Sequence, residues 1–200
     1  APVALAAQRA EWPIHSLDRP HPVVVHPGGP ALIAPPADAV VLFDGHSLDK
    51  WRSDADSAAV APWRIEAGAL VVVPGKGGIH TRERFGDVQL HVEWMAPVPP
   101  ELDGQNRGNS GVFLMGRYEV QVLDSWENVT YADGQAASVY GQYPPLVNAS
   151  LPPGSWQSYD IIFRRPRFNA AGAVTEPARI TVFHNGVLVQ SQVALLGPTS

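Results

Sequence analysis

The chain has 200 residues, of which 45% are hydrophobic and 16% are charged, and its formal net charge is −5. These values exclude a disordered chain, and no apolar run approaches the roughly 20 residues that a membrane-spanning helix needs. Basic residues are too sparse for a nucleic-acid-binding stripe, and the absence of cysteine excludes disulfides and thiolate metal sites.

The first 37 residues are a proline-rich leader. Proline lacks a backbone N–H and holds its predecessor in an extended conformation, so we expect a strap over the domain, with one edge strand at Val23 to Val25. The leader's histidines, His15, His21 and His26, lack a metal-binding pattern and are interpreted as loop residues. The small residues at positions 1–7 suggest a mature N-terminus left after cleavage, which predicts a secreted or periplasmic bacterial protein.

From residue 38 onward, short strand-forming segments alternate with Gly, Pro, Asn and Asp turn signals, and no segment has a sustained helical period. The pattern predicts one antiparallel all-β sandwich over residues 38–200. The expected strands are 38–45, two within 63–73, 78–81, 88–95, 111–115, 118–123, 156–164, 179–185 and 187–190.

Two of these strands alternate polar and apolar residues. Because successive side chains in a strand point to opposite faces, Glu119 and Gln121 share one face of their strand, as His91 and Glu93 do of theirs. An antiparallel sheet with one face in water shows the same alternation. Arg107 and the aromatic residues of nearby loops favour instead a cleft with converging polar groups.

Residues 125–155 form a long segment rich in Trp, Tyr and Gln, which includes Tyr140 and Gln142. Loops of this length are usually functional or disordered, and the aromatic content argues against disorder. Aromatic rings beside amide groups suit sugars, so this segment is a candidate carbohydrate-binding loop. The alternative is a packed Ω-loop that seals the edge of the sandwich.

Several motifs together resemble the bacterial 3-keto-disaccharide hydrolase-like domain family from about residue 38 to the end. They are Leu42-Phe43-Asp44-Gly45, Gly108-Asn109-Ser110-Gly111, Tyr118 to Ser125, Gly154 to Asp160 and His184-Asn185-Gly186-Val187. The resemblance implies a concanavalin A-like jelly-roll sandwich that acts on glycosides already oxidised at sugar C3. The C3 ketone acidifies the C2 hydrogen, so a base can start an elimination that expels the glycosidic oxygen, after which water adds.

The resemblance also implies roles for particular residues. Glu93 and Glu119 would supply the base and the acid, and His91 or His80 would share that task or hold a divalent metal with a carboxylate. The substrate-binding candidates are Arg107, Asn109, Gln121, Asp124, Tyr140 and Gln142.

Members of that family usually continue beyond the position of residues 197–200 with a Gln-Asp-His-Gly segment and a last strand. Without them, a sandwich edge would be unpaired, and the leader of the same chain or of a neighbouring copy would fill it by strand addition. This predicts, as an alternative to an enzyme, a self-associating subunit of an extracellular assembly. A third alternative is a carbohydrate-binding module, which needs the polar cleft but no base.

Overall fold

The computed structural model describes residues 12–29, 34–100 and 102–199, and within them nearly all regular structure is β-strand. The described residues fall into two compact units, one within residues 1–32 and 86–200 and the other within 33–85. The predicted all-β, antiparallel class is confirmed. In the part of the chain that is described, no helix is long and apolar enough to cross a membrane.

The larger unit is built on a four-stranded antiparallel sheet in the order β14 (Val187–Ala194), β13 (Arg179–His184), β10 (Trp156–Arg164) and β6 (Val88–Met95). Strands β6 and β10 have the bounds that the sequence predicts. Alternation sends Tyr159, Ile161 and Phe163 to the buried face of β10, where each is at most 1% exposed.

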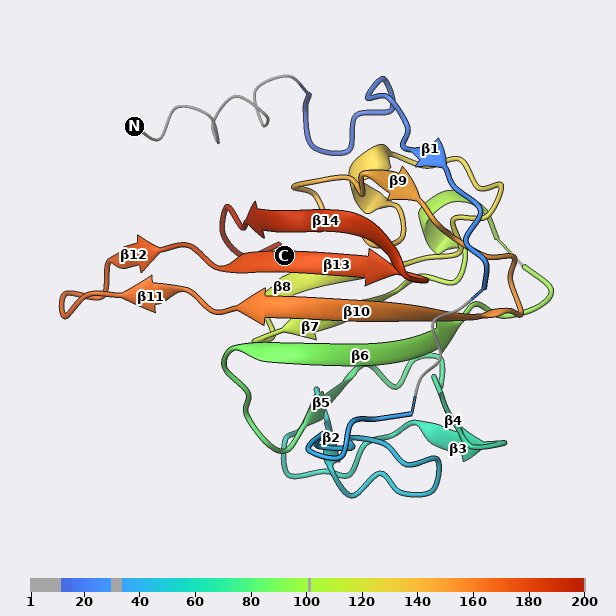
Figure 1. The fold of residues 1–200 in the computed structure, drawn as a ribbon. Coiled ribbons are helices and arrows are strands. Elements are labelled where there is room, and N and C mark those ends of the chain that lie inside the picture. Colours follow the sequence, from blue (N-terminus) through green and yellow to red (C-terminus); the bar gives the residue numbers. More distant parts are fainter. Residues whose placement is uncertain (1–11, 30–33, 101, 200) are drawn as a thin grey trace. The chain divides into compact units, whose positions relative to one another are not determined.

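The second layer is the hairpin of β7 (Ser110–Leu114) and β8 (Tyr118–Val122), which lies behind the four-stranded sheet in Figure 1. An isolated bridge from Val139 to Val120 extends it on the other side of β8. Val120, Val122 and Val139 join Trp94 and Tyr159 in one buried apolar cluster, so the core lies between the two layers. This two-layer packing is the sandwich that the sequence predicts.

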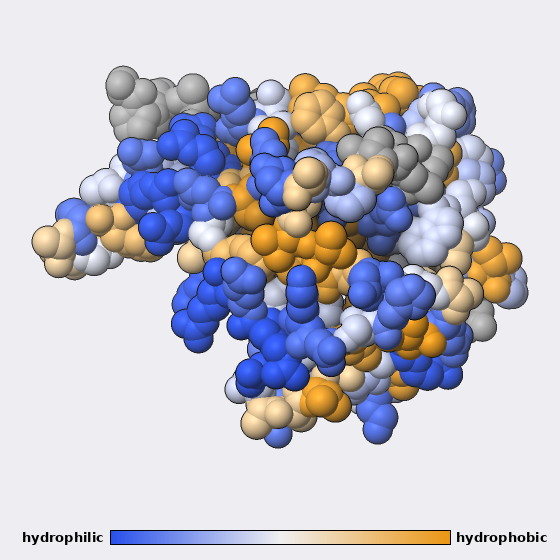
Figure 2. All heavy atoms as spheres, turned by 60° about the horizontal axis from the view of Figure 1, so that its bottom comes forward, coloured by the Kyte–Doolittle hydropathy of each residue, from blue (hydrophilic) through white to orange (hydrophobic). Residues whose placement is uncertain are grey.

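Shorter elements complete this unit. Two 3-10 turns, η1 (Gly104–Asn106) and η2 (Ala132–Gly134), lie in loops, and β11 (Arg167–Phe168) pairs with β12 (Val174–Glu176). Figure 2 shows this last hairpin as an arm that projects from the body of its unit and carries both hydrophobic and hydrophilic side chains. The sequence pattern does not predict this hairpin.

The leader contributes β1 (Val23–Val24), which pairs in parallel with β9 (Val147–Asn148), and Val25 N–H donates to Asn148 O at 2.9 Å. The predicted leader strand is therefore confirmed. Its partner is a short strand of the same chain that precedes β10, and self-association through the leader stays a prediction.

The smaller unit contains two antiparallel strand pairs, of which one is a hairpin. β2 (Trp51–Ser53) pairs with β5 (Ile79–Thr81), and β3 (Arg64–Glu66) pairs with β4 (Ala69–Val71). The turn between β3 and β4 has positive φ at both Ala67 (48°) and Gly68 (78°), which matches the twist of a two-residue hairpin.

The strand predicted at 38–45 is not formed, and this prediction was wrong. Val40 and Val41 are 53% and 40% exposed. The carbonyl oxygens of Val41 and Leu42 accept hydrogen bonds from the side chains of Lys50 and Trp51, so this segment is held by side chains and not by a neighbouring strand.

Candidate active site

Glu119 is the centre of the candidate site. It lies on β8 on the face opposite the buried Val120, together with Gln121, as the alternation predicts. The amide group of Gln121 lies 3.1 Å from Glu119 Oε1 and 2.8 Å from Ser110 O, and with its nitrogen on this side it donates to both. Because Gln121 is only 1% exposed, it holds the glutamate in one place.

Gly111 makes room for this carboxyl group. It lies directly opposite Gln121 in the β7–β8 pairing, and a Cβ atom at this position would be 2.2 Å from Glu119 Oε1. The glycine near the start of β7 therefore forms the surface over which the glutamate lies. Phe113, opposite Glu119 in the same pairing, is 48% exposed and offers a ring beside it.

Two tyrosines stand near this carboxyl group. The hydroxyl groups of Tyr131 and Tyr140 are 2.8 Å apart, and Tyr140 N–H donates to Glu119 O at 3.2 Å. Burial raises the pKa of the Tyr131 hydroxyl, and the hydrogen bond to Tyr140 and the charges of Asp133 and Glu119 raise it further. The hydroxyl therefore stays protonated and is available as a hydrogen-bond donor.

Amide side chains form the edge of the site next to η1. Gln105 Nε2 donates to Thr130 Oγ1 at 2.8 Å and to Gly134 O at 2.9 Å, and Asn109 Nδ2 donates to Gln105 O at 2.7 Å. With the Gln121 nitrogen directed at Glu119, Gln121 Oε1 lies 3.1 Å from Gln105 Oε1. Sequence reasoning missed Gln105 because it precedes the predicted strand and belongs to no motif.

Glu119 also has the electrostatics of a base. Burial raises the pKa of its carboxyl group above the ordinary value of 4.5, since a partly buried carboxylate loses hydration. A carboxyl with a raised pKa is a better proton acceptor at neutral pH than an exposed one. The site thus combines a positioned base, two tyrosine hydroxyl groups, amide groups and an exposed ring, which are the groups that a sugar substrate needs.

Comparison with known proteins identifies the family of this chain. Residues 38–200 match the model of the 3-keto-alpha-glucoside-1,2-lyase-like domain. The chain belongs to this family. The predicted family is thereby confirmed, and it points to a sugar-active, glycosidase-like protein.

Individual relatives can be named. The chain is 24% identical over 165 residues to the 3-keto-disaccharide hydrolase of Bacteroides thetaiotaomicron, covering 64% of this chain and 54% of that protein, so it spans about half the length of this curated relative. A crystal structure of a candidate glycosyl hydrolase from Parabacteroides distasonis superposes with a TM-score of 0.81 at 43% identity, covering 90% of this chain and 77% of the other. A second candidate glycosyl hydrolase from that organism shares the fold at 18% identity, with a TM-score of 0.58 over 80% and 78% of the two chains.

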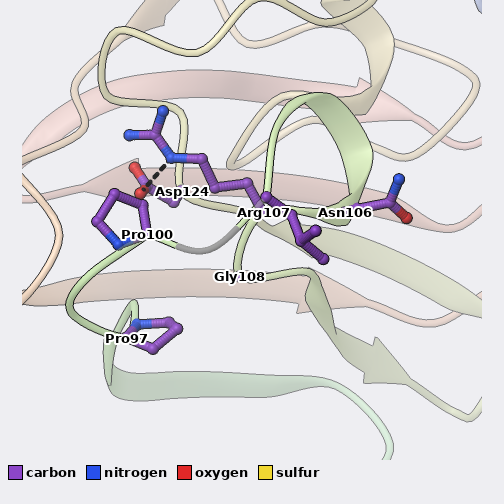
Figure 3. Close-up of a pocket in the computed structure, with 7 residues that line it drawn as sticks. Pro97, Pro100, Asn106, Arg107, Gly108 and Asp124 are labelled. Carbon is purple, nitrogen blue, oxygen red and sulfur yellow. Dashed lines mark hydrogen bonds and ion pairs between the residues drawn. The ribbon is translucent and has the colours of Figure 1, made fainter.

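In this family member, Arg107 and Asp124 form an internal ion pair beside a small cavity of about 180 Å³. Figure 3 shows Arg107 reaching across to Asp124, with Pro97 and Pro100 on neighbouring segments. Arg107 Nε donates to Asp124 Oδ2 at 2.7 Å and its Nη2 donates to Trp126 O at 2.7 Å. These predicted substrate-binding groups thus also join the loop before β7 to the end of β8.

The other predicted catalytic residues, His91 and Glu93, lie elsewhere. Trp94 of β6 and Val120 of β8 both point into the core, so Glu93 and Glu119 lie on opposite outer surfaces of the sandwich. On the surface that carries Glu93, His91 Nδ1 is 2.7 Å from Asp160 Oδ1, and His91 Nε2 is 3.4 Å from Glu93 Oε1. The structure therefore does not bring the two glutamates together, and Asp160 is a partner that sequence reasoning missed.

The last two predicted residues have partners of their own. Gln142 Nε2 donates to Gly197 O and its Oε1 accepts from Leu196 N–H, each at 2.9 Å, so this amide binds the backbone after β14. His80 belongs to the smaller unit, where Nδ1 lies 2.9 Å from Asp54 Oδ1. Among the described residues, no three His, Cys, Asp or Glu side chains are grouped as metal ligands would be.

Proposed function

We propose that the Glu119 site cleaves glycosides that carry a ketone at C3 of the sugar, by elimination across C1 and C2 followed by addition of water. The observation that carries the proposal is the half-buried carboxyl group of Glu119, fixed by the Gln121 amide and standing near the hydrogen-bonded hydroxyls of Tyr131 and Tyr140. The family's description and the Bacteroides relative support the same substrate class.

In the first step Glu119 takes the proton from C2. The electron pair of that C–H bond forms the C2–C3 double bond, and the ketone oxygen becomes negatively charged. A protonated tyrosine hydroxyl donates a hydrogen bond to this oxygen, where charge develops in the transition state. The raised pKa of Glu119 helps this step, because proton transfer is favoured when the base has a pKa near the working pH.

In the second step the ketone re-forms, a C1–C2 double bond forms and the bond from C1 to the glycosidic oxygen breaks. The protonated Glu119 is the acid available to the departing oxygen, so one carboxyl group gives back the proton that it took. The hydroxyl group of a water molecule then adds to C1 and a proton from that water to C2, which yields the free 3-keto sugar. Gln105, Asn109 and Phe113 are the groups that would hold the sugar hydroxyls and ring.

The test compares a 3-keto-glucoside with the same glucoside unoxidised. We expect the protein to cleave the 3-keto-glucoside and not the unoxidised glucoside. Deuterium at C2 should slow release of the aglycone, or the hydrogen at C2 should exchange with solvent during the reaction. Equal cleavage of the unoxidised glycoside would contradict the proposal. Tight binding of the ketone without turnover or exchange would indicate a binding module.

A further inference from the structure

The leader places a histidine against the tyrosines of the site. The ring of His15 lies 4.1 Å from the ring of Tyr131 and 5.1 Å from that of Tyr140, measured between centroids. Its backbone N–H donates to Asp133 Oδ2 at 3.1 Å, and its Nδ1 is 3.6 Å from Asp133 Oδ1. His15 thus spans the gap between a carboxylate and the two rings that stand near Glu119.

The Asp133 carboxylate has no access to water. Asp133 lies in η2, and its side chain is only 1% exposed. It contacts the leader at His15. Among the described residues, Asp133 Oδ1 and His15 Nδ1 have no hydrogen-bond partner, and they face each other at 3.6 Å. A buried carboxylate without a hydrogen bond is costly, so the bond that Asp133 Oδ2 accepts from the His15 N–H anchors the leader here.

The backbone of His15 points the same way. Its φ is +61°, in the left-handed region that residues other than glycine adopt rarely and at some energetic cost. Surrounding contacts must hold such a conformation. Here the Asp133 hydrogen bond does so, and the side chain is directed onto Tyr131 as a result.

We propose that His15 is a positioning residue of the Glu119 site, supplied by the leader, that together with Asp133 holds the Tyr131–Tyr140 hydroxyl pair where it can donate to the substrate. The proposal rests on the proposed function of Glu119 and adds to it a residue outside the family-matched range of 38–200. His15 acts through the tyrosines and transfers no proton itself.

The leader offers a matched control. His21 lies six residues further on, and its Nδ1 is 3.2 Å from Gln135 Nε2, a contact that also ties the leader to the same loop. Replacing His21 would loosen the leader without removing a group from the tyrosine pair. Replacing His15 by Phe would keep a ring on the tyrosines and remove the contact of Nδ1 with Asp133.

The experiment measures His15→Ala, His15→Phe and His21→Ala by two readouts. The first is the NMR spectrum of protein labelled at its five tyrosines, which needs no turnover. We expect the Tyr131 and Tyr140 ring signals to shift in His15→Ala and to stay unchanged in His21→Ala, with His15→Phe between them.

The second readout is kinetics on the 3-keto-glucoside. We expect kcat of His15→Ala to fall by about ten- to a hundredfold with KM little changed, because misplaced donors weaken binding of the transition state. Unchanged tyrosine signals in His15→Ala, or an equal loss of kcat in His21→Ala, would overturn the proposal. If the wild-type protein turns over no ketone, the proposed function fails, and the tyrosine signals still decide whether His15 positions the pair.

Discussion

At the scale of single residues, the structure separates two glutamates that the sequence presents alike. Glu93 and Glu119 both alternate with apolar neighbours, yet only Glu119 is held by a buried amide and lies near the hydrogen-bonded hydroxyl groups of Tyr131 and Tyr140. Glu93 instead contacts His91 on the outer surface of the four-stranded sheet. This difference can be tested by changing each carboxyl group to the amide of the same shape.

We expect Glu119→Gln to lower kcat by about 10²- to 10⁴-fold, the usual contribution of a general base. Glu93→Gln, on the opposite surface, is the matched control and should keep the wild-type rate. Steady-state kinetics on a 3-keto-glucoside measure both. Similar losses in the two variants would show that the choice of Glu119 as base is wrong.

The same Glu119→Gln variant should be at least as stable as the wild type at pH 7. Because burial raises the folded pKa of Glu119, this residue's contribution to stability is present below its unfolded pKa and is lost as pH rises through the folded pKa. Gln carries no charge and avoids that loss. Thermal unfolding from pH 4 to 8 checks this: the variant's advantage should grow with pH, and a constant difference would contradict it.

Gly111→Ala should displace the Glu119 carboxyl group without disturbing the fold. The added methyl group would lie 2.2 Å from Glu119 Oε1, and the far end of a flexible side chain can move away. We expect kcat/KM to fall at least tenfold while thermal stability changes little, since a small misplacement of a catalytic group is costly. In a Glu119→Ala background, Gly111→Ala should have no further effect on kcat/KM. A further loss in the double variant would show that Gly111→Ala does not act by displacing the Glu119 carboxyl group.

At the scale of elements, the ion pair between Arg107 and Asp124 joins the loop after η1 to the end of β8. The two side chains are 11% and 2% exposed, and Asp124 Oδ1 also accepts from Trp126 N–H. The guanidinium group of Arg107 therefore holds the segment that enters β7 against the segment that leaves β8. Removing one partner of such a pair leaves the other charged and buried, which is costly.

Arg107→Ala should accordingly lower the free energy of unfolding by about 3–5 kcal/mol. The exposed pair of Arg64 and Glu66, 60% and 54% exposed, is the control, and Arg64→Ala should cost at most about 1 kcal/mol. Urea unfolding followed by tryptophan fluorescence measures both variants. Equal losses would mean that burial does not strengthen the Arg107 pair.

At the scale of the whole molecule, a buried histidine sets the response to acid. His184 is 1% exposed, lies 2.9 Å through Nε2 from Gln157 Oε1 and stacks on Trp94. Burial lowers its pKa to about 3. Unfolded chains bind a proton at histidine near pH 6.5, so between about pH 6.5 and 3 the unfolded state holds the extra proton and stability falls as pH falls.

His91 acts in the opposite direction. Burial by itself would lower its pKa, but the hydrogen bonds and charges of Asp160 and Glu93 outweigh it and raise the pKa, so its contribution is present at low pH and lost as pH rises. Because the His91 side chain is 30% exposed, its effect on the pH dependence of stability is smaller than that of the buried His184. We therefore expect a net loss of stability below pH 6.5, and a flatter pH profile in His184→Gln, even though that variant is less stable at pH 7. If stability falls with pH as steeply in His184→Gln as in the wild type, groups other than His184 cause the sensitivity to acid.

Local patterns were sufficient to predict much of the fold. Strands β6 and β10 have the predicted bounds because period-two alternation over eight or nine residues leaves no other regular structure. The predicted strand at 38–45 failed because Lys50 and Trp51 side chains occupy its carbonyl groups, which no local pattern reveals. Of the candidate site, Glu119, Gln121, Asn109 and Tyr140 are predicted as site residues from the sequence, whereas Gln105 and Tyr131 are not and His15 is predicted only as a loop residue.

The sequence by itself determined the class of fold, the family and the face of each strand on which a side chain lies, because alternation and turn chemistry are local properties of the chain. Only the tertiary structure decided which faces meet. Alternation places Glu93 and Glu119 relative to their own strands, but β6 and β8 belong to opposite layers, so the two carboxyl groups point away from each other. The same long-range packing brings His15 to Tyr131 across more than a hundred residues, a contact that burial of Asp133 stabilises and that no local pattern encodes.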